Sequence, residues 1–386
     1  MKLIPYGRQN ISFEDIKSVS DSLKSDLITT GLYVKKLEKK LISFLKAKYV
    51  ISCTSGTAAL HMVLLSINLK KNDIIIMPAI NFVAIYNLCK LIGAKIFLAD
   101  VSPDTGQMTP ASLLNCIKKN KIKKIKAIVT MYLGGYPQNI NKFYKIKKKY
   151  KCYLIEDACH ALGAKYKVGK RVFNIGSCAH SDFCVFSLHP VKTITSGEGG
   201  LVTTNNQSFA EKIKLLRSHG IIKSSHWKYD IKFPALNYRL SDINCALALS
   251  QLKRIKKFIS TRKEIFNLYK NSFLHQTDLL SLPNYEDVNR SSFHLFLVKI
   301  NFSKLTKNKD FFIKEMLKKK IMLQFHYIPI FLFKNIYKSK FQAKDFLGSL
   351  SYQKTHVSLP IYVGLEKKYI TSIVKKINQF IKKYKK

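Results

Sequence analysis

Short apolar runs alternate with longer amphipathic segments along the first half of this chain. The apolar runs cover residues 49–53, 74–77, 95–98, 127–130 and 152–155. Segments 83–92 and 112–117 lie between them and are long enough for crossover helices. Such alternation predicts a mainly parallel sheet with helices on both faces, which is an α/β fold.

Polar residues follow several of the predicted strands. They occupy residues 54–57, 81–82, 156–160 and 187–192. Because the carboxyl ends of parallel strands meet at one edge of a sheet, and ligands bind beyond that edge, we expect these groups to converge. Each of these motifs is weak evidence taken singly, whereas their convergence indicates a ligand site.

A single lysine, Lys192, lies between two strand-like runs at residues 182–187 and 201–204. It is therefore expected on a loop that is held at both ends. Leu188 and Val191 can supply apolar walls, and an apolar site lowers the pKa of a lysine by disfavouring its charged form, as Schiff-base chemistry requires. The competing interpretation is a solvated surface lysine, which is the usual one for a lysine taken by itself.

The small-residue turn at 54–57 precedes a helical pattern at 58–65. The first N–H groups of a helix have no intrahelical partner and lie at the positive end of its dipole, so this turn is a candidate phosphate seat. An ordinary Ser/Thr helix cap is the alternative. The turn is neither a P-loop nor a G-x-G-x-x-G dinucleotide motif.

Pyridoxal 5′-phosphate (PLP) requires a lysine, a carboxylate at the ring nitrogen, a phosphate seat and a flat side chain against the ring. Candidates for these four roles are, in order, Lys192, Asp157, Gly56 and Thr57 with Ser187, and Phe82. Each also has a purely structural interpretation: Asp157 as a helix cap, Phe82 as a core residue, and the nearby His160 as a buried structural histidine. No metal site is predicted.

The net charge of +44 would ordinarily suggest a nucleic-acid or membrane partner. Seven of the 67 basic residues are arginine, which leaves 60 lysines spread along the chain. Proteins that bind nucleic acid favour arginine for bidentate contacts to bases and phosphates. The excess of lysine over arginine therefore indicates a compositional lysine bias on solvated faces. A basic polyanion-binding protein is kept as a distant alternative.

The eight cysteines form no C-x-x-C pair, and neither a secretory signal nor an apolar run of membrane-spanning length is present. We therefore expect reduced thiols in a soluble, cytoplasmic protein without a membrane span.

The length of 386 residues favours two domains. We expect a large domain at residues 1–255 and a smaller α+β domain at 256–386, with residues 1–25 able to pack on the smaller one. An N-terminal amphipathic segment has Phe13, Ile16, Val19 and Leu23 at helical spacing, which predicts a helix with an apolar packing stripe.

Several motifs together resemble one known family. They lie at residues 55–60, 81–84, 156–163, 186–200, 217–220, 237–242 and 326–330. The chain resembles, almost from end to end, the sugar aminotransferases of the DegT/DnrJ/EryC1/StrS family. The resemblance implies the aspartate-aminotransferase fold (fold type I), in which a large domain with a mainly parallel seven-stranded sheet precedes a smaller α+β domain.

On the matching positions the resemblance implies PLP as cofactor. Lys192 is then the Schiff-base lysine and proton shuttle, with Asp157 beside the ring nitrogen. His160 is placed near the ring hydroxyl. The sugar dehydratases of the family are an alternative function, but they typically carry histidine in place of the lysine, so Lys192 argues against them.

The resemblance also implies how the cofactor phosphate is held. Gly56, Thr57 and Ser187 bind it from one subunit, and Asn237 reaches it from the neighbouring subunit. The enzyme is therefore expected to be an obligate homodimer with shared active sites.

Within the family, motifs such as residues 4–9, 25–31 and 325–330 are most similar to the C4 aminotransferases of pseudaminic acid synthesis. These enzymes transfer an amino group from L-glutamate to UDP-2-acetamido-2,6-dideoxy-β-L-arabino-hex-4-ulose. Aminotransferases of the perosamine, bacillosamine or legionaminic-acid type are the alternative. Substrate contacts are expected from Tyr6, Thr30, His326 and Tyr327.

Overall fold

The computed structural model describes residues 3–273, 278–333 and 342–386. A seven-stranded sheet has the order β1-β9-β8-β5-β4-β2-β3. Its strands are β1 (Tyr49–Cys53), β2 (Ile74–Pro78), β3 (Lys95–Ala99), β4 (Ala127–Met131), β5 (Tyr153–Asp157), β8 (Phe183–Ser187) and β9 (Gly200–Thr204). β9 is antiparallel to both neighbours, and the other strands share one direction. The expected mainly parallel α/β sheet is therefore confirmed.

Helices cover both faces of this sheet because its strands carry apolar residues on both sides. Ile75 and Met77 of β2 face one side of the sheet, where they share a core with α3 (Gly56–Ser66) and α4 (Ala84–Ile92). Residues of α7 (Gln207–Leu216) belong to the same core. Ile76, between Ile75 and Met77, points the other way, toward α5 (Pro110–Lys119) and α6 (Ile140–Tyr150). Such two-sided burial is typical of parallel sheets.

The N-terminal helix α1 (Phe13–Leu23) packs on α8 (Asp242–Lys253), and α2 (Leu32–Leu45) packs on α8 and β1. The helix at 13–23 was expected, but of its apolar stripe only Val19 is half-buried, and the other three residues are exposed. Phe13, Ile16 and Leu23 are 75%, 59% and 56% exposed, whereas Asp15 is fully buried. Asp15 faces inward because it forms an ion pair with Arg254 at the end of α8.

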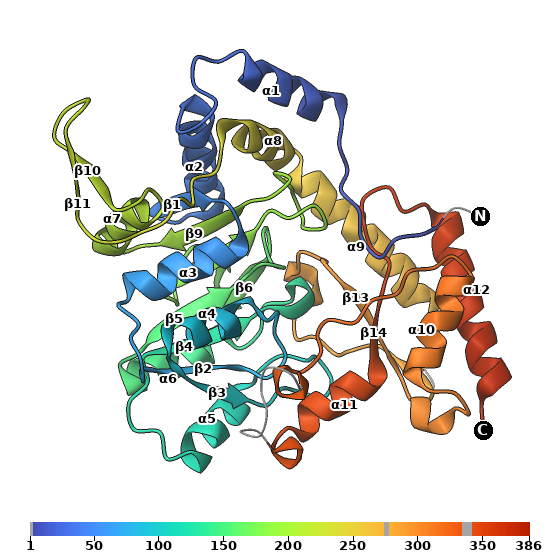
Figure 1. The fold of residues 1–386 in the computed structure, drawn as a ribbon. Coiled ribbons are helices and arrows are strands. Elements are labelled where there is room, and N and C mark those ends of the chain that lie inside the picture. Colours follow the sequence, from blue (N-terminus) through green and yellow to red (C-terminus); the bar gives the residue numbers. More distant parts are fainter. Residues whose placement is uncertain (1–2, 274–277, 334–341) are drawn as a thin grey trace.

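The C-terminal part has a core of its own. A three-stranded sheet of β12 (Leu280–Ser281), β13 (Phe296–Ile300) and β14 (His356–Leu359) is antiparallel. Around it lie α9 (Ile255–Ser272), α10 (Lys309–Lys318), α11 (Leu347–Thr355) and α12 (Lys367–Tyr384), which form a separate group of ribbons beside the large sheet (Figure 1). Ile4, near the N-terminus, forms an isolated bridge with Ile321 in this part, and the division of the chain after residue 255 stays a prediction.

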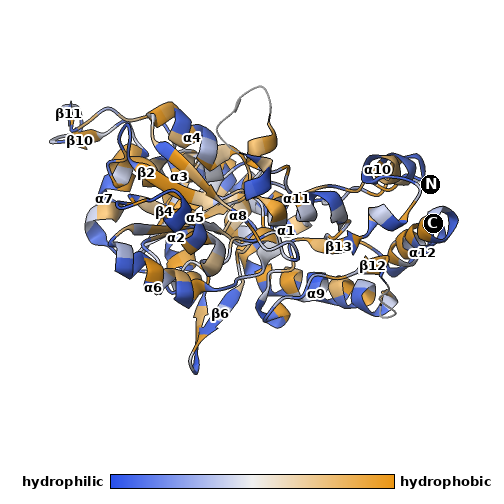
Figure 2. Ribbon diagram, turned by 90° about the horizontal axis from the view of Figure 1, so that it is seen from below, coloured by the Kyte–Doolittle hydropathy of each residue, from blue (hydrophilic) through white to orange (hydrophobic). Residues whose placement is uncertain are grey.

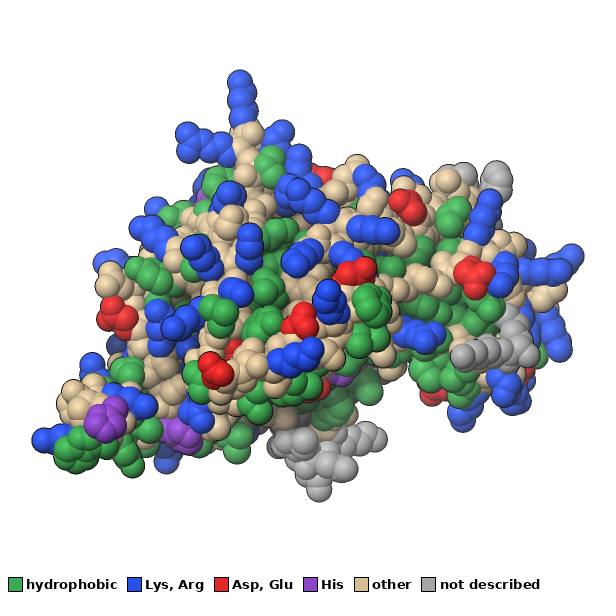
Figure 3. Space-filling model, turned by 90° about the horizontal axis from the view of Figure 1, so that it is seen from above, with side chains coloured by type: hydrophobic (Ala, Val, Ile, Leu, Met, Phe, Trp, Pro, Cys, Tyr) green, Lys and Arg blue, Asp and Glu red, His purple; other side chains and the backbone are tan. Residues whose placement is uncertain are grey.

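Two hairpins project from the body of the molecule (Figures 1 and 2). β6 (Lys165–Val168) pairs with β7 (Arg171–Asn174), and β10 (Ile221–Lys223) pairs with β11 (Tyr229–Ile231). On the face seen in Figure 3, lysine and arginine side chains are scattered across the surface instead of forming one stripe. Across the described residues, no helix is both long and apolar enough to cross a membrane.

Candidate active site

A cavity of about 500 Å³ opens beyond the carboxyl ends of β5 and β8. It is lined by ten of the residues predicted from the sequence, namely Tyr6, Gly56, Thr57, Phe82, Asp157, His160, Ser187, Lys192, His326 and Tyr327. Thr30 and Asn237 do not line it. Residues that sequence reasoning did not single out also line it, among them His294 and Gln324. They come from the C-terminal part, and no local motif marks them.

Lys192 is presented by a loop that backbone hydrogen bonds hold at several points. Leu188 N–H donates to Gly199 O at 2.8 Å, and Lys192 N–H donates to His189 O at 2.9 Å. Of the two predicted apolar walls, Val191 lines the cavity, whereas Leu188 is fully buried in the core beneath it and is not among the lining residues. Burial lowers the pKa of Lys192, while the charges of Cys159 and Asp157 oppose that shift. A lysine in this setting loses its proton more readily than one in water.

Asp157 occupies the last position of β5 and is 3% exposed. The Cys159 N–H donates to its Oδ1 at 3.2 Å. Burial raises the pKa of Asp157, and hydrogen bonds from Cys159 together with the charge of Lys192 lower it. A buried carboxylate that faces a cavity can stabilise a cationic N–H group of a ligand, which is the role expected at a protonated pyridine nitrogen.

The start of α3 meets the end of β8 at the cavity. Ser55 caps the helix, because its Oγ accepts a hydrogen bond from Ala58 N–H at 3.0 Å, so the cap interpretation holds for this residue. A Cβ added to Gly56 would lie 3.1 Å from Cys159 Sγ and 3.2 Å from Ser187 Cβ. Gly56 therefore keeps open a narrow space in front of unpaired helix N–H groups, and the exposed Thr57 hydroxyl adds a donor.

The buried His160 connects the large sheet to the C-terminal part. Gly134 N–H donates to its Nδ1 at 3.3 Å, and its Nε2 lies 2.9 Å from the Tyr327 hydroxyl. The ring of Tyr327 lies 5.7 Å from that of Phe82, which is 53% exposed at the cavity wall. Phe82 is thus a wall residue and not a core residue.

Thr30 and Asn237 lie in two loops that are joined to each other. Thr29 forms a bridge with Ser241, and Asp242 N–H donates to Ile28 O at 2.9 Å. Asn237 Oδ1 accepts a hydrogen bond from Arg239 N–H at 3.2 Å. The structure keeps both residues away from the cavity of their own chain.

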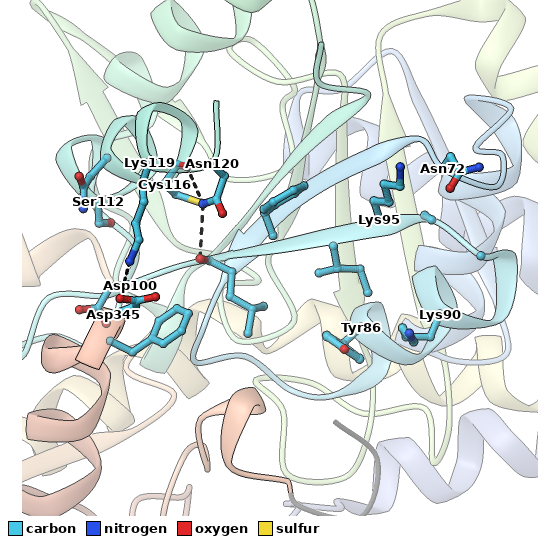
Figure 4. A pocket seen from close by; sticks show the side chains of 17 residues that line it. Asn72, Tyr86, Lys90, Lys95, Asp100, Ser112, Cys116, Lys119, Asn120 and Asp345 are labelled. Carbon is cyan, nitrogen blue, oxygen red and sulfur yellow. Dashed lines mark hydrogen bonds and ion pairs between the residues drawn. The ribbon is translucent and has the colours of Figure 1, made fainter. Parts of the chain in front are cut away.

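A second cavity, of about 510 Å³, lies at the outer edge of β3 (Figure 4). Some of its polar groups join this edge of the sheet to the C-terminal part. The Asp100 carboxylate accepts hydrogen bonds from Gly348 and Ser349, and Lys119 forms an ion pair with Asp345. Asp100, Lys119 and Asp345 thus hold the C-terminal part against this edge of the sheet, whereas the predicted site residues line the first cavity, which is the better candidate for chemistry.

Residues 9–378 match the model of the DegT/DnrJ/EryC1/StrS aminotransferase family. The chain belongs to this family. The predicted resemblance is thereby confirmed, and the chain is a sugar aminotransferase.

Relatives and solved structures agree with this assignment. The UDP-4-amino-4,6-dideoxy-N-acetyl-beta-L-altrosamine transaminase of Campylobacter jejuni is 33% identical over 100% of this chain and 99% of its own length. Helicobacter pylori PseC, an aminotransferase involved in pseudoaminic acid biosynthesis, is 27% identical with a TM-score of 0.87, covering 99% of this chain and 100% of PseC. A Streptococcus pneumoniae protein described as a sugar aminotransferase, in its PLP form, is 26% identical with a TM-score of 0.89 and 99% coverage of each chain.

Proposed function

We propose that this aminotransferase uses PLP to move the amino group of L-glutamate to C4 of a nucleotide-linked 4-keto-6-deoxy sugar. The acceptor we propose is UDP-2-acetamido-2,6-dideoxy-β-L-arabino-hex-4-ulose, as in pseudaminic acid synthesis. The observation that carries the cofactor assignment is that Lys192, Asp157 and the N-terminus of α3 line one cavity. The C. jejuni relative and PseC support the choice of acceptor.

PLP supplies an electron sink that stabilises negative charge on the carbon from which a proton is removed. Asp157 would stabilise the proton on the ring nitrogen, and Phe82 would lie against the ring. Gly56, Thr57 and Ser187 would hold the phosphate at the start of α3. Their convergence in a narrow space that a Cβ would fill fits a phosphate group.

Lys192 Nζ would then have two tasks. In its uncharged form, which burial favours, it would hold the cofactor. When it is free, the same nitrogen would be the general base that takes the proton from the donor's α-carbon and returns it on the other side of the transfer. Both tasks require Nζ to move, and its position on a loop between β8 and β9 permits this.

We propose further that two copies of the chain form the active enzyme. The stripe of Phe13, Ile16 and Leu23 is exposed, and so are Trp227 and Tyr229 on the projecting hairpin, at 70% and 62%. Apolar surface of this extent is costly in water and indicates a protein interface. A second copy that covers it brings Asn237 to the phosphate of its neighbour.

The test is an absorbance spectrum of the purified protein with PLP, followed by L-glutamate and then by a panel of nucleotide-linked 4-keto-6-deoxy sugars. We expect a long-wavelength band that glutamate bleaches and the UDP-linked L-arabino ketosugar restores. Restoration by a different sugar would assign the chain to the perosamine, bacillosamine or legionaminic type. Absence of a band with PLP would overturn the cofactor assignment.

A further inference from the structure

Arg262, in the middle of α9, is buried with an exposed fraction of 2%. Its Nη1 donates to Ile361 O at 2.9 Å and to His294 O at 3.4 Å, while its Nε has no hydrogen-bond partner among the described residues. Burial lowers the pKa of Arg262 to about 10, so the guanidinium still carries its charge at neutral pH. The protein therefore holds a full positive charge in its interior.

This charge has no carboxylate partner within the part of the chain that the structure describes. The half-buried Arg217, by contrast, forms an ion pair with Glu38 at 2.7 Å. Arg262 has two carbonyl oxygens as acceptors, which carry only partial negative charge. A buried charge without a counter-charge is costly, so we expect a further group to compensate it.

A small cavity of about 10 Å³ adjoins Arg262. A volume of this size admits one water molecule or one monatomic ion. The loop that carries Lys192 borders it, and Lys192 lines both this small cavity and the candidate active site. Arg8 also lines the small cavity and is exposed, so the cavity has an entrance from solvent.

The lining of the small cavity is cationic. Arg8, Lys192 and Arg262 line it, whereas none of the described lining residues is an aspartate or a glutamate. Thr193 is buried in the same lining and adds a hydroxyl that is able to donate. A site with three cations, a hydroxyl donor and no carboxylate is complementary to an anion.

The nearest hydrogen-bond network does not provide the missing negative charge. The side-chain amide of Gln251 lines the cavity and donates to Asp15 at 2.6 Å. That carboxylate lies outside the lining and forms an ion pair with Arg254. The negative charge of Asp15 is thus already paired.

We propose that this cavity is a binding site for a small monovalent anion, with chloride as its ligand. A water molecule would fill the space but leave the positive charges uncompensated, whereas chloride is only slightly larger than water and carries the opposite charge. Sulfate and phosphate are too large for a cavity of this volume. The bound anion would offset the repulsion between Arg262 and its cationic neighbours, and would stabilise the loop that carries Lys192.

Thermal unfolding tests the proposal in solution. Sodium gluconate is replaced stepwise by sodium chloride at constant ionic strength, because gluconate is too large for the cavity. The melting temperature of the wild-type protein should rise by about 2 °C for each tenfold increase in chloride above its dissociation constant. Arg262→Met should lose this rise, and Arg8→Met, which changes an exposed residue, should reduce it.

The matched control is Arg171→Met, which removes an exposed arginine on β7 and should keep the full rise. Effects of chloride on the lysine-rich surface are common to all four proteins, so the difference between them reports the cavity. An equal rise in all four proteins would overturn the proposal, as would no rise in the wild type. If Arg262→Met does not fold, the comparison of Arg8→Met with Arg171→Met decides.

Bromide locates the site, because it replaces chloride and scatters X-rays anomalously. A wild-type crystal grown with sodium bromide should show an anomalous peak beside the Arg262 guanidinium, and an Arg8→Met crystal should show a weaker one. Absence of a peak in the wild type would overturn the proposal. A peak without any effect of chloride on the melting temperature would mean binding at crystal concentration only, and would also overturn it.

Discussion

Asp242 fastens the loop that carries Thr30 to the start of α8. Its carboxylate is fully buried and accepts backbone N–H groups from Gly31 at 2.6 Å, Tyr33 at 2.7 Å and Val34 at 3.3 Å. These are the first N–H groups of α2, which have no partner within the helix. We expect that replacing Asp242 by alanine strongly lowers the free energy of unfolding.

The size of that effect follows from the bonds lost. A buried N–H without a partner costs about 1–3 kcal/mol. Counting the two short bonds, from Gly31 and Tyr33, at the middle of this range gives about 4 kcal/mol for Asp242→Ala. Asp242→Asn keeps one carbonyl oxygen but loses the charge at the helix start, so a loss of about 2 kcal/mol is expected.

Urea unfolding of the protein without added PLP, followed by circular dichroism, measures this loss. Asp21→Ala is the matched control, because Asp21 is an exposed acid on α1 and its removal should change stability by less than about 0.5 kcal/mol. The midpoint should shift at constant slope. A loss below about 1 kcal/mol in Asp242→Ala would show that water or a shifted backbone replaces these bonds, and would refute the reasoning.

Three further outcomes are expected. Lys192→Ala should abolish amino transfer and leave the melting curve unchanged, as assayed by turnover and circular dichroism; retained transfer would remove Lys192 from its central role. Gly56→Val should weaken PLP binding at least about tenfold in an absorbance titration, because its side chain meets Cys159 and Ser187. Phe13→Ser combined with Ile16→Ser should produce folded monomers by light scattering, since both side chains are exposed on one chain; an unchanged mass would place the interface elsewhere.

The sheet could be predicted from the sequence because its strands are short, continuous apolar runs. The run at 49–53 coincides with β1, and the run at 152–155 differs from β5 by one residue at the start and two at the end. Given a parallel sheet, the convergence of Asp157 and Lys192 followed from strand direction alone. A mainly parallel order does not fix which strand is reversed, and the structure shows that this is β9.

What the sequence could not predict depends on contacts between distant segments. His160 and Tyr327 are 167 positions apart, and no local pattern indicates that they share a hydrogen bond. The apolar residues of α1 recur at helical spacing, which predicted the helix. Their spacing does not show whether the stripe is covered by the same chain or by another molecule. Asp15 decided the orientation, because its ion pair with Arg254 turns the polar face inward.

The cavity's charge supports a site completed by a second copy. Among the described residues that line it, Lys192 is the single lysine or arginine, while Asp157 and Glu198 are acidic. The proposed donor is a dicarboxylate and the proposed acceptor carries a diphosphate, and such groups are usually bound by guanidinium or ammonium groups. Arg239 lies in the same loop as Asn237 and is half-buried, so a second copy that brings Asn237 to the cofactor also brings a guanidinium.

Subunit complementation tests this shared site. Lys192→Ala removes the reacting nitrogen, and Asn237→Asp places a negative charge opposite the cofactor phosphate, so each variant should be nearly inactive alone. A mixed dimer has one site in which Lys192 of one chain meets Asn237 of the other. Unfolding and refolding the two variants together in equal amounts should therefore recover about a quarter of wild-type activity, because half of the dimers are mixed and each has one intact site. No recovery, with mixed dimers shown by mass spectrometry of differently tagged chains, would mean that Asn237 serves its own subunit.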